Sequence, residues 1–403
     1  MQGTLTANRL SDRINSLEES QTIGMAKKAR ELAAKGHDVI NLSFGEPDFQ
    51  TPQYIKDAAK KAIDEGFTFY TPVPGYPDLR KAISDKLLRD NNLSYPVDQI
   101  VVSTGAKQSI ANAILCLINP GDEVIILGPY WVSYLEVVKL AGGVPVVVSG
   151  DAEQGFKATA TQIEAAVTGN TRVIIYSSPC NPTGAVFNQQ ELSDIADVVL
   201  RYENLYVIAD EIYEHINFTG AHYSMAAIPA VKERVITING LSKAYAMTGW
   251  RVGYMAAEKW ITDACDKMQG QITSGTCSIA QKAATAALNG SQKPTEEMSA
   301  AFLRRRDLVV AWANAIPGVS VSSPDGAFYI FPKIDSYFGR SKGETVINNS
   351  TDLAMYILNT SFVSVVPGDA FGDDSCIRIS FAASDAKLKE AFERIAAALA
   401  ELK

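Results

Sequence analysis

Residues 239–253 read NGLSKAYAMTGWRVG, a run of small and polar residues that follows the apolar segment VITI at 235–238. Lys243 lies among the small residues, and Arg251 follows it eight positions later. A lysine whose pKa is lowered by burial and by its neighbours can form a Schiff base with a carbonyl compound. Taken alone, the pair is more often a surface lysine on a turn and an arginine in a salt bridge. Other motifs must therefore decide its role.

The composition is that of a globular protein with a substantial core. The 403 residues are 47% hydrophobic and 20% charged, and the length predicts two or three domains. The net charge of −8 argues against a generic surface for nucleic acids or anionic membranes. No uncharged apolar run approaches the length of a membrane span. Residues 1–5 lack a basic region followed by an apolar run, so we expect no signal peptide.

The cysteines and histidines predict neither disulfides nor a metal site. The five cysteines are an odd number, lie far apart and form no CxxC pair, which is typical of reduced thiols in a cytoplasmic protein. The three histidines are too few and too scattered for a His-rich metal site, so we expect no metal.

Short β-branched runs alternate with helical segments through the middle of the chain. Strands are expected at 101–102, 124–127, 144–148, 173–176, 206–209 and 235–238, with helices at 105–118, 131–141, 160–168 and 188–202 between them. Apolar strands separated by helices predict an α/β fold with a mostly parallel sheet that is covered on both faces. We assign residues 45–290 to this large domain.

The two ends of the chain have a different pattern and predict a smaller α+β domain at 291–403. A long helical stretch at 257–288 and 293–314 leads to it. It contains expected strands near 318–322, 327–331, 363–366 and 376–381, and a closing helix at 384–401. A helix at 11–36 is expected in the N-terminal segment, residues 1–44, which we assign to the same domain.

Several informative residues follow the expected strands, where ligands bind in open α/β sheets. Gly105, Ala106 and Lys107 form a tight turn into a helix, whose free N–H groups suit a phosphate. Trp131 follows the next strand and could stack on a flat heterocycle, or cap the sheet as a core residue. Gly45 begins a Gly-Glu-Pro turn that suits a sharp exit beside a ligand, and equally an ordinary loop.

Three polar residues complete the set. Asn181 lies between two prolines in SSPCNPTG, a rigid turn of the kind that can hold a cis bond and fix the Asn amide as a donor. Asp210 ends an apolar strand, where a buried carboxylate needs a partner such as a protonated pyridine nitrogen; the alternative is a helix N-cap. Arg378 lies within an apolar strand and calls for a carboxylate, from a structural glutamate or from a substrate.

These residues together match pyridoxal 5′-phosphate (PLP). Its aldehyde suits Lys243, its phosphate suits Arg251 and the turn at 105–107, and its pyridine ring suits Asp210 and a stacked tryptophan. Tyr213, three residues after Asp210, could donate to the ring oxygen. The combination favours a PLP site over the surface-lysine alternative.

At this point the chain resembles the class I/II aminotransferases, PLP enzymes of the aspartate aminotransferase fold (fold type I). The resemblance extends from about residue 10 to the C-terminus. The blocks GEPDF, GPYWVSY, SSPCNPTG, ADEIYEH, NGLSKAYAMTGWRVG and GAFYIFP occur in the family's order and spacing. The resemblance implies that Lys243 is the catalytic residue, forms the Schiff base with PLP and moves a proton during the reaction.

The resemblance also implies roles for the other site residues. Cofactor-binding residues would be Gly105, Ala106, Lys107, Trp131, Asn181, Asp210, Tyr213, Ser242, Lys243, Arg251 and Tyr70. Substrate-binding residues would be Gly45, Lys107, Trp131, Asn181, Arg378 and Thr22. Tyr70 would reach the phosphate in a partner subunit, because these enzymes resemble one another in building each site across a homodimer. One departure is Gly240, where some relatives carry a phosphate-binding serine; Ser242 is expected to substitute.

The implied reaction is ping-pong transfer of an amino group from aspartate or glutamate to 2-oxoglutarate or oxaloacetate. The chain is more similar to the bacterial and plant-plastid branch, in which a lysine at the position of Lys107 serves acidic substrates; its alternative role is a counter-charge to phosphate. Some members of that branch transaminate prephenate and resemble this chain at Thr22, at Lys107 and across 366–374, so prephenate transamination is the alternative. A PLP-sensing regulator is not favoured, because only about ten residues precede the first expected helix.

Overall fold

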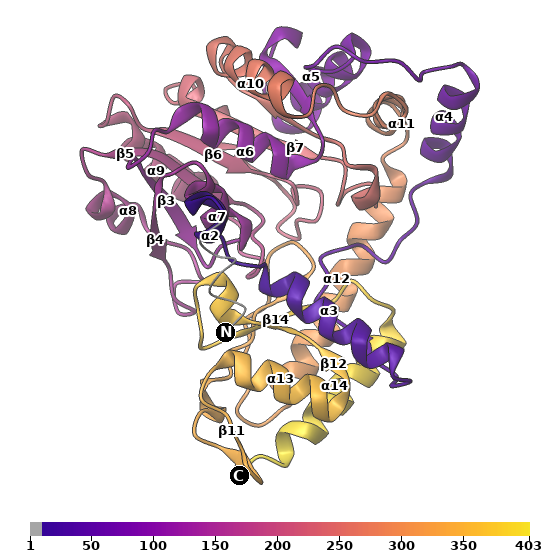
Figure 1. Ribbon diagram of the computed structural model, residues 1–403, viewed down its shortest axis with the longest axis vertical. Helices are drawn as coiled ribbons and strands as arrows, with labels where there is room; N and C mark the ends of the chain where they lie inside the picture. Colours follow the sequence, from indigo (N-terminus) through magenta and orange to yellow (C-terminus); the bar gives the residue numbers. More distant parts are fainter. Residues whose placement is uncertain (1–9) are drawn as a thin grey trace.

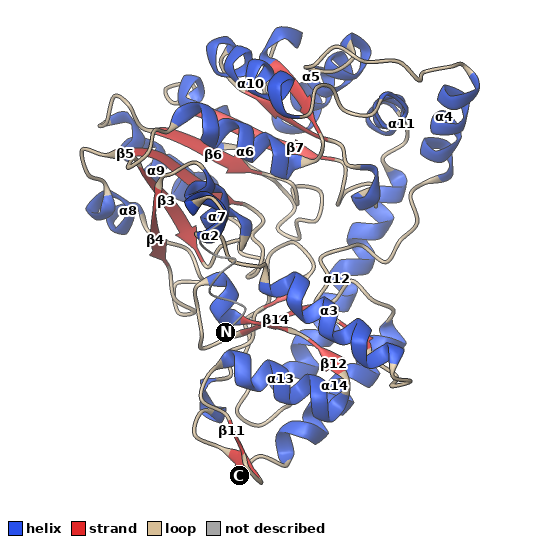
Figure 2. Cartoon of the chain, viewed as in Figure 1, coloured by secondary structure: helices blue, strands red, loops and turns tan. Residues whose placement is uncertain are grey.

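A seven-stranded sheet forms the centre of the larger part of the protein. The structure is a computed structural model that describes residues 10–403; the segment 1–5, for which no signal peptide is expected, lies outside the described residues. The strand order is β2-β8-β7-β6-β5-β3-β4, and β8 alone pairs antiparallel to its neighbours (Figures 1 and 2). The strands are β2 (Ile100–Ser103), β3 (Glu123–Gly128), β4 (Val144–Ser149), β5 (Thr171–Ser177), β6 (Tyr206–Asp210), β7 (Val235–Gly240) and β8 (Gly253–Ala256).

Helices cover both faces of this sheet, as the two-sided burial of its strands predicts. Val124 and Ile126 of β3 pack into one apolar cluster, and Ile125 and Leu127 pack into another, because successive strand residues point to opposite faces. The first cluster is closed by α6 (Ala106–Leu117), α7 (Ser133–Leu140) and α10 (Lys259–Ile272). The second is closed by α4 (Gln53–Asp64), α5 (Pro77–Asn91), α8 (Ala160–Ala166), α9 (Gln189–Leu200) and α11 (Ser278–Asn289). The predicted α/β fold with a mostly parallel sheet is confirmed.

The smaller part contains short strands and long helices. β9 (Tyr329–Ile330), β14 (Ile377–Ser380) and β13 (Val366–Pro367) form an antiparallel sheet, β1 (Ile40–Asn41) pairs with β12 (Val363–Ser364), and β10 (Ser341–Lys342) pairs with β11 (Thr345–Val346). Around them lie α3 (Gln21–Ala34), α12 (Lys293–Asn314), α13 (Ser350–Ser361) and α14 (Asp385–Ala400), with α12 extending toward the large sheet (Figure 1). Residues of α3 and β1 share the apolar cluster of this part. The domain limits at 45 and 291 stay predictions.

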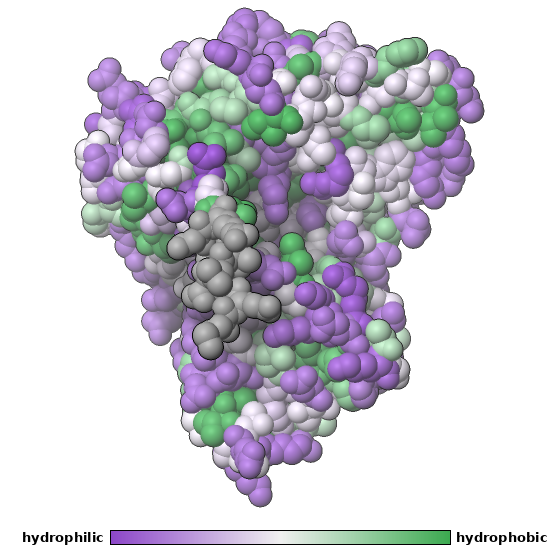
Figure 3. Space-filling model, viewed as in Figure 1, coloured by the Kyte–Doolittle hydropathy of each residue, from purple (hydrophilic) through white to green (hydrophobic). Residues whose placement is uncertain are grey.

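Single-turn helices complete the described secondary structure: η1 (Val97–Gln99), η2 (Met225–Ala227), η3 (Lys232–Arg234), η4 (Thr248–Trp250), η5 (Asp335–Tyr337) and η6 (Gly368–Phe371). The face in Figure 3 carries mixed polar and apolar residues. Within residues 10–403, no helix combines the length and the apolar character that a membrane crossing requires. The five cysteines carry free thiols.

Three expected elements differ from the structure. The helix expected at 11–36 is broken into α2 (Asp12–Asn15) and α3, and between them the Glu18 N–H donates to the Glu136 carboxylate at 2.8 Å. The stretch at 257–288 is broken between α10 and α11, where Ser274 has a φ of 60° and leaves helical geometry. The strand expected at 318–322 is reduced to a single bridge between Ser320 and Lys333.

Candidate active site

A cavity of about 560 Å³ opens at the carboxyl ends of the large sheet, beside the smaller part. The segments that follow β3, β5, β6 and β7 all reach it, as the position of ligands in open α/β sheets predicts. The sequence-predicted residues that line it are Thr22, Gly45, Ala106, Lys107, Trp131, Asn181, Asp210, Tyr213, Ser242, Lys243, Arg251 and Arg378. Tyr70 does not line this cavity and is 98% exposed. Its expected role toward a partner subunit stays a prediction.

Lys243 follows β7 and points its amine into the cavity. Its Nζ donates to the carbonyl oxygen of Gly45 at 2.5 Å. Burial, together with the positive charges of Arg378 and Arg251, lowers the pKa of Lys243 to about 8, against the opposing effect of Glu46 and Asp210. A larger fraction of this amine is therefore uncharged near pH 7 than for a lysine in water. The uncharged amine is the form that attacks a carbonyl.

Asp210 ends β6 and is 4% exposed. Its Oδ2 accepts a hydrogen bond from the Tyr134 hydroxyl at 2.6 Å, and its Oδ1 accepts from the backbone N–H of Ile212 at 3.2 Å. Burial raises the pKa of Asp210 to about 6, although the bond from Tyr134 lowers it. The residues after Asp210 form a turn and no helix, so the N-cap alternative does not apply. A buried carboxylate of this kind is stabilised by a cation brought in by a ligand.

Positive groups surround the start of α6. Gly105 precedes this helix with a φ of 88°, and a Cβ added there would lie 2.2 Å from Arg251 Nη2, so only glycine lets the guanidinium approach. Arg251 is held by the carbonyl oxygens of Thr248 at 3.0 Å and Thr104 at 3.4 Å. With the N–H groups of the helix start and the buried Ser242 nearby in the same cavity, this corner fits a phosphate.

Lys107 and Trp131 lie together in the same cavity. The Lys107 ammonium is 4.9 Å from the centre of the Trp131 ring. Burial lowers the pKa of Lys107, and the nearby Arg251 lowers it further. The Trp131 ring lines the cavity and meets Tyr134 edge-on, with ring centres 5.4 Å apart. Its position leaves the ring available for stacking on a ligand.

Arg378 on β14 is buried, with 2% exposure, and its hydrogen bonds among the described residues go to an amide and a backbone oxygen, not to a carboxylate. Its Nη1 donates to Asn181 Oδ1 at 2.9 Å and its Nη2 donates to the Ser43 carbonyl oxygen at 2.6 Å, while its Nε has no partner. The structural-glutamate alternative is therefore wrong. The Asn181–Pro182 bond is cis, and with Oδ1 occupied the amide nitrogen of Asn181 stays available as a donor. The pair fits an incoming carboxylate.

Sequence reasoning missed several residues of this cavity. Tyr134 holds Asp210, the Tyr329 hydroxyl lies 2.8 Å from the Tyr213 hydroxyl, and Glu46 accepts from the Thr248 hydroxyl at 2.8 Å. The Tyr329 ring also lies under Arg378, with the guanidinium carbon 4.6 Å from the ring centre. Each of these residues could have been found from the sequence, because Tyr134 lies in the block GPYWVSY, Tyr329 in GAFYIFP and Glu46 in GEPDF.

The donor set fits PLP. A buried acid without a cation, a lysine with a lowered pKa, an anion corner and an aromatic ring that faces the cavity match its pyridine nitrogen, aldehyde, phosphate and ring. Fold and site together define a PLP-dependent enzyme of the aspartate aminotransferase-like fold.

Comparison with known proteins gives the family. The model of the class I and II aminotransferases matches residues 37–395. The chain is 48% identical over 399 residues to the bifunctional aspartate aminotransferase and glutamate/aspartate-prephenate aminotransferase of Petunia hybrida, covering 98% of this chain and 83% of that one. It is 47% identical to the aspartate/prephenate aminotransferase of Cereibacter sphaeroides, covering 98% and 99%.

A solved structure of an aspartate aminotransferase has the same fold as this chain. The aspartate aminotransferase from Rhizobium meliloti superposes with a TM-score of 0.95 at 43% identity, covering 98% of this chain and 99% of that one. The chain belongs to the class I and II aminotransferases and is a PLP-dependent aminotransferase.

Proposed function

We propose that this aminotransferase acts on amino acids with an acidic side chain and on the matching 2-oxo acids. The observation that carries the proposal is a pair of cations in one cavity, Arg378 and Lys107. Arg378 and the Asn181 amide suit the α-carboxylate that every amino acid carries, and Lys107 suits a second carboxylate. Aspartate and glutamate, with oxaloacetate and 2-oxoglutarate, have two carboxylates. Relatives that are 48% and 47% identical carry aspartate in their names.

Different residues of the chain have different roles in the reaction. PLP, when bound, supplies an aldehyde that exchanges an amino group and a ring that withdraws electrons. Lys243, whose neutral form is favoured by burial, would take the proton from the substrate Cα and pass it to the PLP carbon that bore the aldehyde oxygen. Asp210, held by Tyr134, keeps a positive charge on the ring nitrogen.

Binding falls to the other residues of the cavity. Gly105, Ala106, Ser242 and Arg251 would hold the phosphate, Trp131 would stack on the ring, and Tyr213 and Asn181 would donate to its oxygen. Gly45 lies against Lys243, where it borders the substrate carboxylate. Thr22, in the first turn of α3, lines the cavity and would lie on the substrate side.

Prephenate is the second candidate substrate. Both relatives named above carry prephenate in their names, and Thr22 lines the cavity in this chain. We also infer a homodimer in which Tyr70 completes the partner's site, since this tyrosine is almost fully exposed and lies away from its own cavity. The five free thiols suit a cytoplasmic protein.

The test is a set of single half-reactions. The enzyme is converted to its amine form and mixed with oxaloacetate, 2-oxoglutarate, prephenate or pyruvate, and the absorbance of the cofactor is followed. Fast recovery with the two dicarboxylates and slow recovery with pyruvate supports the proposal. Recovery with prephenate at a comparable rate adds the second substrate. Recovery that is as fast with pyruvate as with oxaloacetate would contradict the assignment to acidic substrates.

A further inference from the structure

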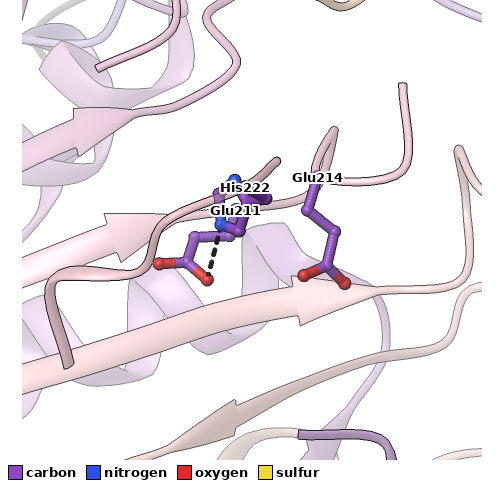
Figure 4. A group of neighbouring side chains, drawn as sticks. All are labelled: Glu211, Glu214 and His222. Carbon is purple, nitrogen blue, oxygen red and sulfur yellow. Dashed lines mark ion pairs between the residues drawn. The ribbon is translucent and has the colours of Figure 1, made fainter. Parts of the chain in front are cut away.

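The turn that follows β6 has two faces. Asp210 and Tyr213 line the active-site cavity, whereas Glu211 and Glu214 do not and lie near His222, which comes from the following loop (Figure 4). One oxygen of each carboxylate and one ring nitrogen of His222 all lie within 4.8 Å of one another. The three side chains therefore form a compact set of oxygen and nitrogen donors behind the active site.

Glu211 is the unusual member of this set. The residue is 1% exposed, and neither carboxylate oxygen accepts a hydrogen bond from the described residues. Its charged contact is His222 Nε2, 3.1 Å from Oε2 (Figure 4). The side chain of His222 is only 8% exposed, and its Nδ1 lacks a partner in the described chain. Buried carboxylates are costly unless they are hydrogen-bonded, paired or bound to a metal, so these free lone pairs call for a ligand.

Glu214 is held in place and still has room for a ligand. Lys86 and Asn239 donate to its Oε1, the latter at 2.8 Å, and His215 Nε2 lies 3.3 Å from the same oxygen, whereas within residues 10–403 Oε2 accepts only from Asn91, at 2.6 Å. A carboxylate oxygen has two lone pairs, so Oε2 keeps one. Lys86 pairs with Glu214, and the charged contact of Glu211 is His222, whose ring proton a bound metal ion would replace.

A route to the cluster exists. A cavity of about 720 Å³ lies next to it and is lined by Glu214, His215 and His222, with Asp90 and Glu296 at its wall. The carboxylates of this wall attract cations, although Arg89 lines it too, and the space admits water. An ion bound to the three side chains would keep an open position for such a water.

We propose that Glu211, Glu214 and His222 form a site for one divalent transition-metal ion, of the Zn²⁺ or Co²⁺ type. Two carboxylates and one imidazole suit these ions, and three protein ligands with one water is a common coordination for zinc. The ion ties the turn that carries Asp210 and Tyr213 to the loop at 222, and so stiffens one wall of the active site. The proposal departs from the expectation of no metal, because 211, 214 and 222 show no metal-ligand spacing until the loop folds back. It does not depend on the substrate proposal.

The test uses the PLP-loaded enzyme. The protein is dialysed against Zn²⁺ and its metal content is measured, and Co²⁺ is then added to record the visible absorbance of a low-symmetry site. Glu211→Gln and His222→Gln remove single ligands at nearly equal size. Cys277→Ser removes the exposed thiol, the most accessible competing zinc ligand, and Glu296→Gln removes a wall carboxylate outside the ligand set.

The expected result is about one ion per chain in the wild type and in Cys277→Ser and Glu296→Gln, because three protein ligands make one site. The affinity falls at least about tenfold in Glu211→Gln and in His222→Gln, since even outer-shell changes cost that much. The Tm of the wild type rises with saturating Zn²⁺, and the Tm of Glu211→Gln does not. Absence of stoichiometric metal from the wild type overturns the proposal. Metal binding by His222→Gln with the affinity of the wild type also overturns it. This second variant keeps the test valid even if Glu211→Gln does not fold.

Discussion

Replacing Lys243 with methionine should stabilise the cofactor-free protein at neutral pH. Methionine keeps a long unbranched side chain and removes the ammonium group, which in the wild type lies in the cavity near Arg378 and Arg251. Burial and these two arginines disfavour the charged amine. This lowers the free energy of unfolding of the wild type, and the variant does not have this effect.

The size of the effect follows from the pKa of Lys243. That pKa is about 8 in the folded chain against an ordinary value of 10.5. The difference of about 2.5 pH units corresponds to about 3 kcal/mol, at about 1.36 kcal/mol for each unit. Because the folded pKa is lowered, the folded chain binds fewer protons than the unfolded chain between about pH 8 and 10.5, and wild-type stability rises with pH in that window. The variant lacks this rise, so its advantage is largest below pH 8 and shrinks by about 3 kcal/mol by pH 10.5.

Urea unfolding of cofactor-free wild type and Lys243→Met at pH 7, 8.5, 9.5 and 10.5 measures the difference. All other titrating groups are shared and cancel. Lys267→Met, at an exposed position of α10, is the matched control and should parallel the wild type at every pH. Parallel curves for Lys243→Met and the wild type would refute the reasoning, because the lysine would then carry its charge as easily in the cavity as in water.

Other substitutions separate the remaining roles. Asp210→Asn should weaken PLP binding to the cofactor-free protein by about 100-fold to 5,000-fold in a fluorescence titration, since losing one partner of a buried charge pair costs about 3–5 kcal/mol; unchanged affinity would exclude the pairing. Arg378→Lys should lower kcat/KM for every amino acid about 10-fold to 100-fold, since lysine cannot replace the guanidinium fork, while the absorbance of the bound cofactor stays the same. Lys107→Ala should lower kcat/KM for aspartate about tenfold or more relative to alanine, as expected for one charged hydrogen bond, and an unchanged ratio would leave Lys107 with the phosphate alone.

Local patterns predicted the large sheet well. The runs at 173–176 and 206–209 are apolar on both faces, and only a strand between two helical layers buries them in that way. The pattern missed β8, whose four residues begin two positions after Arg251 and pair antiparallel with β2 and β7. The strands of the smaller part are two to four residues long and are defined by their partners more than by their own sequence.

The candidate site was predictable where one segment carries the chemistry, and less so where distant segments meet. Asp210 ends an apolar strand, Arg378 interrupts one and Lys243 follows one closely, and that position marks them. The bond from Tyr134 to Asp210 joins residues that lie 76 positions apart, and the bond from Tyr213 to Tyr329 joins residues that lie 116 apart. No local pattern encodes such a contact. The same holds for the cluster of Glu211, Glu214 and His222, which the fold assembles from a turn and the loop after it.

The most direct test of the central claim is to locate the covalent link between protein and cofactor. The PLP-loaded enzyme is reduced with borohydride and digested, and the peptides are mapped by mass spectrometry. The cavity predicts one labelled lysine, Lys243, because burial favours its neutral amine and places it opposite Asp210. A label on Lys107, the other lysine that lines the cavity, or the absence of any labelled peptide, would contradict the account.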